Sequence, residues 1–418
     1  LDFFYRLRFD GVLDQARLSE SFDAALRQHP LLRSVVSQSG RSYQWTPCES
    51  RPAFVVLPSD TDTGPRHPSA IDLTREPGSR LFVIPGMDRT TLLFQFQHSA
   101  TDGLGAMGFI QDVLLAYVVS RSADPTLPMR DFERLAERHW CGYTTGSLFD
   151  KITKQLHGIY LSRKFLQCRI APLIAHQPQV NTPRTEADGY RDLQHTLTVE
   201  ETATLKKLAR EHKASVNSWL IRDAFVTFDR VRKASDGYCA DDYLRIAVPG
   251  NLRSTQSNDG IPAANFFSMM FPARNSEQIA DPDTLLESIH QEVRQARTDY
   301  YFATFIFALK VIRMIPGGLK RMLHADKCQA TMLFTNVGPT FSGFPSANAV
   351  GQLLLDDAVL THVELVPPMR PFQSIAVALL EYANRQTITL SYDPRLHSDA
   401  EANGILEAYI DQLKSNLG

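Results

Sequence analysis

The sequence is poor in cysteine, and its cysteines follow no metal-binding or disulfide pattern. The five Cys residues among 418 lie far apart and form no CxxC pair. An odd number at such wide spacing argues against a disulfide framework and a zinc site, and favours the reducing cytoplasm. HExxH and Walker patterns are also missing. We therefore expect no metal ligands and no tightly bound cofactor.

Long basic runs and long apolar runs are missing too. The formal net charge is -2, from 44 Lys and Arg against 46 Asp and Glu, and no Lys/Arg cluster interrupts the balance. This excludes the footprint of a nucleic-acid-binding protein and that of a polybasic membrane segment. No stretch approaches the roughly 20 apolar residues that cross a bilayer, and the start, LDFFYRLRFDG, has no signal-peptide pattern. We expect a cytoplasmic protein without a transmembrane segment.

The length of 418 residues exceeds what one hydrophobic core normally supports. Strand-like and helix-like segments alternate in both halves, and the polar, turn-rich segment QPQVNTPRTEADGYRD (177–192) separates them. We predict an α+β fold of two similar two-layer lobes. The expected boundaries are 1–178 for the first lobe, 179–192 for a linker and 193–418 for the second lobe.

One short stretch, HSATDG at 98–103, has the residues and the setting of a reactive site. It follows the strand-like run Thr91–Gln97 and precedes a predicted helix over Leu104–Val119. Because side chains alternate along a strand, His98 shares its face with Phe94 and Phe96. A histidine at a strand end is rigidly held yet reachable, as a general base must be. The plainer interpretation is the polar end of an apolar strand face.

Asp102 and Ser99 each have a limited set of roles. Asp102 either caps the following helix or holds a buried arginine that shapes the loop of His98. A covalent serine mechanism is not favoured, because no GxSxG is present and the side chain of Ser99, adjacent on a strand, would point away from His98.

HSATDG resembles the HxxxDG motif of the chloramphenicol acetyltransferase-like, CoA-dependent acyltransferase superfamily. This superfamily includes the condensation domains of nonribosomal peptide synthetases, wax ester synthases, and plant-type and polyketide-associated acyltransferases. Further segments resemble the family in the same order along nearly the whole chain. They are RQHPLLRSVV (27–36), VNSWLIRDAF (216–225), VPGNLRS (248–254), NFFSMM (265–270), FTNVGP (334–339) and SYDPRLHS (391–398).

The resemblance implies two chloramphenicol acetyltransferase-like lobes in a V, with a tunnel between them that is open at both ends. It implies that His98 lies mid-tunnel and removes the acceptor's proton during attack on a thioester. Asp102 then pairs with an arginine, for which Arg253 has the best position, although Arg253 could instead be a surface residue. Gly103 would give the backbone room for close approach.

Three further residues are expected to bind substrate or line the tunnel: Asn336, Gly338 and Ser268. For Asn336 an ordinary turn before Gly338-Pro339 is an equal alternative. Gln97 stands where condensation domains usually carry the first histidine of HHxxxDG, which makes peptide-bond formation less expected. The DFGWG segment of the plant branch is absent, which argues against that branch.

The favoured function is acyl transfer from a thioester to a hydroxyl or amine, with no covalent enzyme intermediate. Coenzyme A and an alcohol acceptor are preferred, because FTNVGP resembles ester-forming relatives. The donor would be acyl-CoA or a phosphopantetheine thioester, with an acyl carrier protein as a conceivable partner. The alternatives are a free-standing condensation domain that uses carrier-protein thioesters, and a catalytically silent binding or recruitment module with the same fold.

Overall fold

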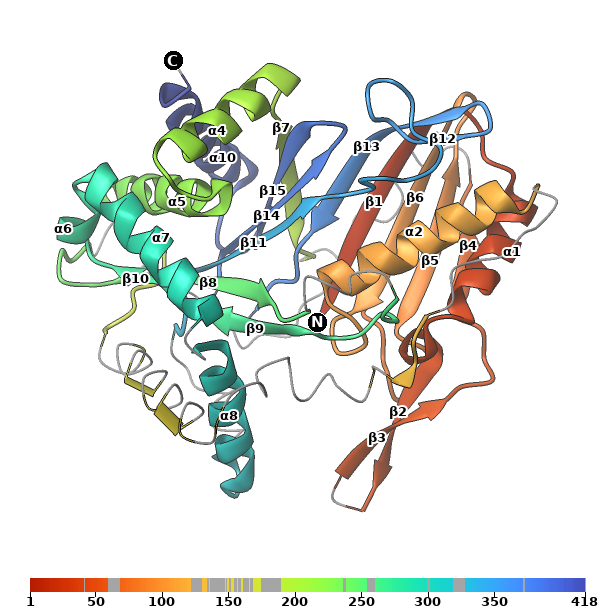
Figure 1. Cartoon of the computed structure of the whole chain (residues 1–418), viewed down its shortest axis with the longest axis horizontal. Coiled ribbons are helices and arrows are strands. Elements are labelled where there is room, and N and C mark those ends of the chain that lie inside the picture. The colour runs from red at the N-terminus through yellow and green to blue at the C-terminus, as the bar shows by residue number, and fades with distance from the viewer. Residues whose placement is uncertain are drawn as a thin grey trace.

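The computed structural model of the chain contains two β-sheets, each covered by its own helices (Figure 1). It describes residues 1–40, 42–58, 68–121, 189–235, 238–253, 260–298, 301–318, 328–370 and 373–417, together with isolated positions between 130 and 173. Within these residues, no helix has both the length and the apolar character needed to cross a membrane.

The first sheet has six strands in the order β12-β13-β1-β6-β5-β4, antiparallel except for the β4–β5 pair. Phe, Leu and Tyr side chains on alternate positions of its strands pack against helices α1 and α2. The elements are β1 (Asp2–Asp10), α1 (Gln15–Leu26), β4 (Ala53–Val56), β5 (Ser79–Pro85), β6 (Arg89–Gln97), α2 (Gly103–Val119), β12 (Leu354–Leu355) and β13 (Ala358–Val366).

The second sheet follows the order β10-β8-β11-β14-β15-β7, and β9 pairs with β8. A second hydrophobic core lies between this sheet and its helices. Its strands are β7 (Arg191–Thr196), β8 (Leu244–Asn251), β9 (Phe267–Met270), β10 (Ala273–Arg274), β11 (Met332–Pro339), β14 (Ile375–Tyr382) and β15 (Arg385–Tyr392). Its helices are α4 (Val199–Glu211), α5 (Val216–Lys233), α6 (Ser276–Ile279), α7 (Pro282–Thr298) and α10 (Asp399–Ser415).

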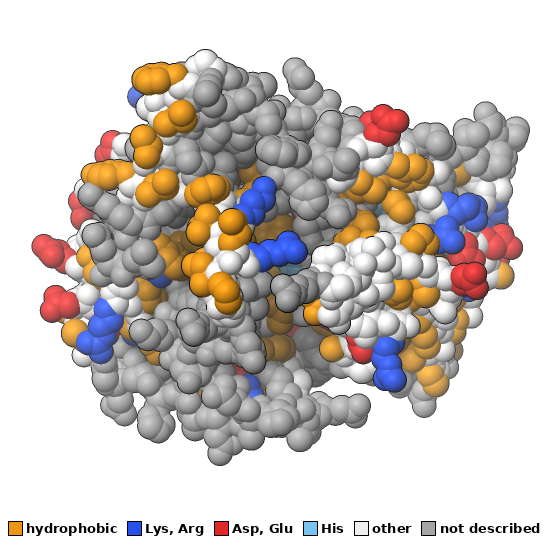
Figure 2. Space-filling model, turned by 90° about the horizontal axis from the view of Figure 1, so that it is seen from below, with side chains coloured by type: hydrophobic (Ala, Val, Ile, Leu, Met, Phe, Trp, Pro, Cys, Tyr) orange, Lys and Arg blue, Asp and Glu red, His pale blue; other side chains and the backbone are white. Residues whose placement is uncertain are grey.

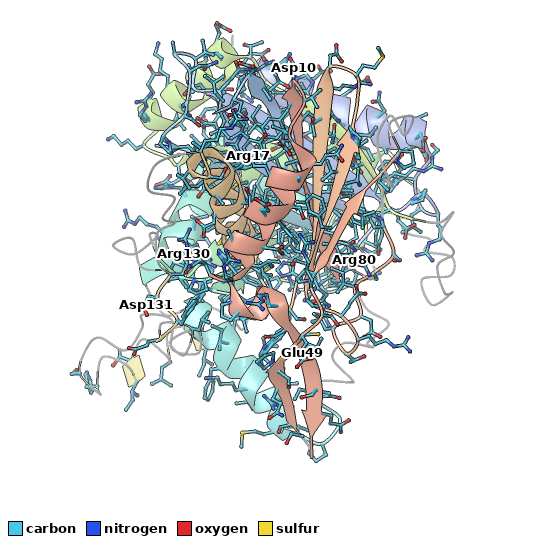
Figure 3. The ribbon with its side chains drawn as sticks, turned by 90° about the vertical axis from the view of Figure 1, so that its right-hand side faces the viewer. Asp10, Arg17, Glu49, Arg80, Arg130 and Asp131 are labelled. Carbon is cyan, nitrogen blue, oxygen red and sulfur yellow. The ribbon has the colours of Figure 1, made fainter. Side chains whose placement is uncertain are left out.

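Two elements extend away from these cores. The short helix η1 (Pro30–Arg33) leads into the hairpin of β2 (Ser34–Ser39) and β3 (Ser42–Pro47), which extends below the first sheet (Figures 1 and 3). Helix α8 (Tyr301–Met314) projects in the same general direction from below β9 (Figure 1). These projections enlarge the lower face of the molecule.

The two-lobed α+β architecture is as predicted, but the predicted lobe boundary is wrong at one place. Strands β12 and β13 come from the range assigned to the second lobe, yet β13 pairs along its length with β1 and so completes the first sheet. Sequence periodicity identifies a strand without identifying its partner. The placement of β12 and β13 in the first sheet was therefore not predicted. Of the predicted linker, residues 179–188 lie outside the described residues, and β7 begins at Arg191.

Candidate functional site

The HSATDG loop joins the end of β6 to the start of α2 at the lower edge of the first sheet. The amide of His98 donates to the carbonyl oxygen of Leu1 at 2.8 Å. The side-chain amide of Asn265 donates to the carbonyl oxygens of His98 and Ser99 at 2.8 and 2.9 Å. Segments from both halves of the chain therefore fix the loop.

The imidazole of His98 is half-buried between two phenylalanine rings. Its ring centroid lies 5.1 Å from that of Phe3 and 5.4 Å from that of Phe267. The ring also hydrogen-bonds the backbone carbonyl of His98 itself. In a neutral imidazole that uses one nitrogen as a donor, the other nitrogen carries the lone pair that accepts a proton.

Burial lowers the pKa of His98 below its ordinary value of 6.5. The bond to its own carbonyl and the charge of Asp102 oppose the shift, whereas the positive charge of Arg370 adds to it. The net direction is downward, because burial is the largest contribution. The imidazole is therefore neutral at physiological pH and ready to accept a proton.

Asp102 performs both of the tasks predicted for it. One carboxylate oxygen accepts from the amide of Gly105 at 2.8 Å and caps α2, and the other accepts from the amide of Phe266 at 2.7 Å. The carboxylate also forms a two-bond pair with the guanidinium of Arg253, with both N–O distances at 2.9 Å and both side chains only 7% exposed. Arg253 is thus the expected partner and not a surface arginine.

Gly103 was expected to give the backbone room for close approach, but the structure does not show a close approach at this residue. A Cβ built there would be 3.5 Å from Tyr5 Oη and from Val337 Cγ2, which is ordinary contact. The close approach occurs two residues later, because a Cβ at Gly105 would come within 2.4 Å of Thr101 Oγ1 and 3.0 Å of the carbonyl oxygen of Ala264. Gly105 lets the segment from the second half of the chain pack against the start of α2.

Ser268 does not have the predicted lining role. Its side chain is buried, and its hydroxyl donates to the carbonyl oxygen of Phe302 at 2.8 Å. This bond attaches the start of α8 to β9. The alternation of strand side chains, which points Phe267 and Met269 away from Ser268, explains the burial of the hydroxyl.

Asn336 and Gly338 lie near the end of β11, where the register of this strand against β14 shifts between Asn336 and Pro339. The side-chain oxygen of Asn336 accepts from the amide of Gly338 at 2.9 Å, and Gly338 has a φ of 78°, which favours glycine. Asn336 therefore belongs to an irregular part of a strand and not to a separate turn, and a role of Asn336 or Gly338 in lining a tunnel stays a prediction. Val337, between them, approaches the position of a Cβ at Gly103 to 3.5 Å, so this end of β11 borders the HSATDG loop.

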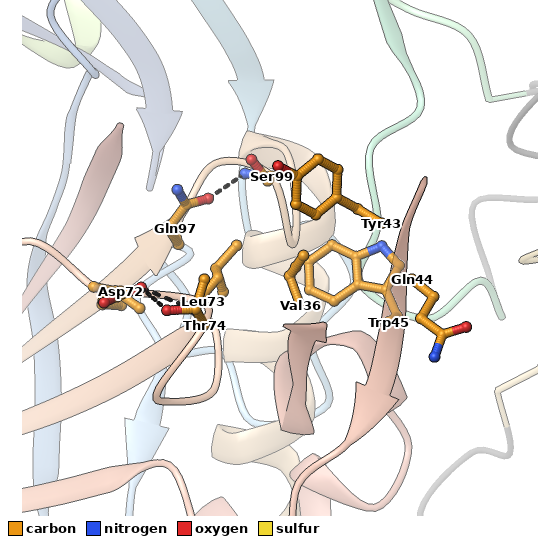
Figure 4. Close-up of a pocket in the computed structure, with 10 residues that line it drawn as sticks. Val36, Tyr43, Gln44, Trp45, Asp72, Leu73, Thr74, Gln97 and Ser99 are labelled. Atoms are coloured by element: carbon orange, nitrogen blue, oxygen red, sulfur yellow. Dashed lines mark hydrogen bonds between the residues drawn. The ribbon is translucent and has the colours of Figure 1, made fainter. Parts of the chain in front are cut away.

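A cavity of about 550 Å³ lies beside this loop, between the β2–β3 hairpin and the end of β6 (Figure 4). Its wall combines aromatic, apolar and amide side chains. Trp45 and Tyr43 come from the hairpin, and Leu73 comes from the loop between β4 and β5. Gln97 and Ser99 flank His98 in the sequence. The volume is within the range of sites that hold a small organic ligand.

Two site residues were missed from the sequence. Asn265 lies within the quoted NFFSMM segment, but an asparagine in an irregular region gives no sign of its partners. Gln97 was noted only as a departure from HHxxxDG, whereas its side-chain oxygen accepts from the amide of Ser99 at 2.5 Å and so stabilises the loop (Figure 4). Only the folded geometry reveals both roles. In the described part of the chain, no group of three or more His, Cys, Asp or Glu side chains is arranged to hold a metal ion.

Comparison with known proteins identifies the fold. The first condensation domain of the calcium-dependent antibiotic synthetase, solved with a substrate analogue, superposes with a TM-score of 0.70 over 100% of this chain and 91% of that chain, at 14% identity. SgcC5 from Streptomyces globisporus gives 0.69 over 100% and 92%, also at 14% identity. The chain has the fold of condensation domains. The fold class expected from the HSATDG resemblance is thereby confirmed, whereas the V arrangement with a tunnel stays a prediction.

Sequence comparison adds one distant relative. No family model matches the chain. An uncharacterized protein of Mycobacterium tuberculosis, Rv2305, is 21% identical over 365 residues, which is 80% of this chain and 79% of that protein. At such identities the comparisons give the architecture, and the chemistry must be argued from the site.

Proposed function

We propose that the protein transfers an acyl group from a thioester to a hydroxyl or amine, with His98 as the general base. The observation that carries this proposal is the neutral imidazole of His98, oriented by its own carbonyl between the rings of Phe3 and Phe267 in a chain with the fold of condensation domains. The free ring nitrogen takes the acceptor's proton as the acceptor oxygen or nitrogen bonds to the thioester carbon. The C–S bond then breaks, and the thiolate leaves with that proton as a thiol.

A thioester is already activated, so this reaction needs no covalent enzyme intermediate. Among the described contacts, none joins the hydroxyl of Ser99 to the imidazole of His98. The pair Asp102–Arg253 acts on the loop and not on substrate, since both side chains are buried and bonded to each other, the carboxylate also accepts from two backbone amides, and the guanidinium also donates to the carbonyl oxygen of Ala264. We assign it to positioning His98.

An alcohol acceptor and acyl-CoA are the preferred substrates. FTNVGP resembles ester-forming relatives, and Gln97 replaces the first histidine of the motif of peptide-forming domains. SgcC5, which has the same fold, was crystallised with (R)-(-)-1-(2-naphthyl)-1,2-ethanediol, a diol. The thioester is a co-substrate in this scheme, whether its thiol belongs to coenzyme A or to phosphopantetheine.

A free-standing condensation domain is the second candidate, because a condensation domain is among the solved structures with this fold. The two candidates differ in the donor. A protein that consumes acyl-CoA supports the first, whereas one that turns over only the thioester of an acyl carrier protein supports the second.

The test is to incubate the purified protein with acyl-CoAs of graded length, and separately with acylated carrier protein, together with small alcohols and amines. Products are identified by mass spectrometry, and His98→Ala is run in parallel. We expect ester or amide formation that His98→Ala loses. Equal turnover by both proteins would overturn the role of His98, and binding of substrates without any turnover would indicate a silent binding module.

A further inference from the structure

Helix α8 exposes a line of large apolar side chains on one of its faces. The residues are Phe307, Val311, Met314 and, directly after the helix, Ile315. Their spacing of four, three and one residues keeps them on the same side of a helix. Met314 is 83% exposed, at the projecting end of the helix (Figure 1). A soluble domain rarely leaves such a line uncovered.

A second line of exposed apolar residues lies next to the first. Positions 149, 152, 156, 159 and 160 are helical, and their side chains are Phe149, Ile152, Leu156, Ile159 and Tyr160. The ring of Phe271 lies 4.9 Å from that of Phe165, in the same segment, and 5.4 Å from that of Phe305 in α8. These ring contacts hold the two segments side by side.

Together the two lines form what we call the basal face, which consists of Phe149, Ile152, Leu156, Ile159, Tyr160, Phe307, Val311, Met314 and Ile315. These nine side chains are half of the 18 large apolar side chains that are exposed among the described residues. The other nine are scattered over the rest of the molecule. Figure 2, which views the molecule from below, shows hydrophobic side chains on this side with Lys and Arg side chains among them. Apolar exposure is therefore concentrated on one side.

The sequence around the basal face is strongly basic. Residues 149–164 and 301–321 contain eight Lys or Arg and one Asp, although the whole chain has a net charge of -2. Lys310 and Arg313 of α8 are exposed beside the apolar line. No basic run is visible in the sequence, because the charges are divided between two segments 150 residues apart.

We propose that the basal face binds the surface of an anionic lipid membrane. A helix with apolar residues on one side and basic residues beside them inserts its apolar side at the boundary of headgroups and acyl chains, while the cations attract anionic lipids. Helix α8, with 14 residues, is too short to span the bilayer and long enough to lie on it. The protein would thus be attached to one leaflet and not embedded.

The basal face is connected to the candidate site through strands β8 and β9. Phe302 of α8 packs so closely on Gly250 of β8 that a Cβ there would overlap its ring. The carbonyl of Phe302 accepts from Ser268 of β9, and the neighbouring Phe267 contacts the imidazole of His98. If acyl transfer occurs as proposed above, a lipid-soluble acyl donor or acceptor in the membrane would be held near the strand that contacts His98. The lipid binding itself does not depend on that reaction.

The experiment is sedimentation of the full chain with vesicles of pure phosphatidylcholine, and of phosphatidylcholine with about a third phosphatidylserine. We expect binding to the anionic vesicles that weakens as salt is raised. The double variant M314E/I315E should bind at least tenfold more weakly. K310E/R313E should lose at least about 25-fold on anionic vesicles, because each of the two cations near such a surface contributes about fivefold.

Met87 gives a matched control, since it is fully exposed on the turn between β5 and β6, away from the basal face. M87E should bind vesicles like the wild type, and all variants should keep the wild-type melting temperature, since the changed side chains are exposed.

The proposal is overturned if the wild type remains in the supernatant with both vesicles, or if M314E/I315E binds unchanged. It is also overturned if M314E/I315E converts a dimer to a monomer, or abolishes binding of a carrier protein, while vesicle binding persists. Loss of vesicle binding with normal acyl transfer in solution would separate this inference from the proposed reaction.

Discussion

His98 is held in place by neighbours from several segments of the chain. Its carbonyl is held by Asn265, its ring by two phenylalanines, and its loop by the buried pair of Asp102 with Arg253. The arrangement separates chemistry from support. A loop that carries a base gains a fixed orientation when the charges that shape it are themselves saturated.

Replacing Asp102 by Asn tests this support. The amide cannot neutralise Arg253, which would remain buried without its counter-charge, so we expect a loss of about 3–5 kcal/mol in the free energy of unfolding. Both the melting temperature and the rate of acyl transfer should fall. Urea unfolding followed by circular dichroism measures the first.

The exposed pair of Asp23 with Arg51, whose N–O distance is 2.7 Å, serves as the control. Asp23→Asn should cost no more than about 1 kcal/mol, because water screens that pair. If Asp102→Asn lowered the free energy of unfolding no more than Asp23→Asn, the buried pair of Asp102 with Arg253 would not contribute the stability that we assign to it.

The pairing of Asp102 with Arg253 is as predicted, because each has a fixed place in a known pattern, whereas the role of His98 as a base stays a prediction. Ser268 and Gly103 were misassigned since their roles depend on which way a strand side chain points and how closely two segments approach. A six-residue pattern encodes neither the direction of a side chain in the folded sheet nor the distance between two segments. The residues that the sequence missed, Asn265 and Gln97, act through backbone contacts that any polar side chain could make.

Among the elements, the start of α2 joins the two halves of the chain. Its first turn packs against the backbone at Ala264, which comes from the segment after β8. Strand β6 and helix α2 were predictable from their periods of 2 and 3.6 residues and from the Asp before the helix. The segment around Ala264, which packs on them, could not be predicted, because it is irregular and its apolar residues follow no period.

Two glycines in this turn provide a matched comparison. Gly105→Ala should lower the free energy of unfolding by about 1–3 kcal/mol, because the new methyl would overlap Thr101 and the carbonyl of Ala264. Gly103→Ala should leave it unchanged or slightly higher, because alanine fits there and favours a helix. Thermal unfolding of both variants measures the difference. Equal effects would mean that the close approach at Gly105 is absent in solution.

Over the whole molecule, a buried charge cluster links the two sheets. Arg6 of β1 contacts Glu364 of β13 at 2.7 Å and Asp192 of β7 at 3.4 Å. Burial raises the pKa of Glu364, although Arg6 opposes the shift. Arg6 and Glu364 lie 358 residues apart, so no sequence pattern could have paired them. The sequence predicts each lobe separately, whereas ion pairs such as those of Arg6 determine how the two sheets are joined.

Replacing Arg6 by Leu should remove about 3–5 kcal/mol of stability, since two carboxylates would remain without their cation. Loss of the cation raises the pKa of Glu364 further. Stability that depends on a raised carboxyl pKa falls as pH rises through that window, so the loss should be larger at pH 8 than at pH 5. Urea unfolding at both pH values measures it.

Arg8→Leu is the matched control, because Arg8 is more exposed and lies 3.9 Å from the same carboxylate. It should change stability by less than about 1 kcal/mol. A pH-independent loss in Arg6→Leu would contradict the proposed role of Glu364.

The central claim is that the neutral imidazole of His98 removes the acceptor's proton, and the pH dependence of kcat/KM tests it most directly. With the best acyl donor and acceptor, the wild type should show an acid limb with an apparent pKa below 6.5, because burial lowers the pKa of His98. In His98→Ala that limb should vanish, and kcat/KM should fall by about 10²–10⁴-fold at pH 7. An unchanged rate and an unchanged acid limb in His98→Ala would contradict the account.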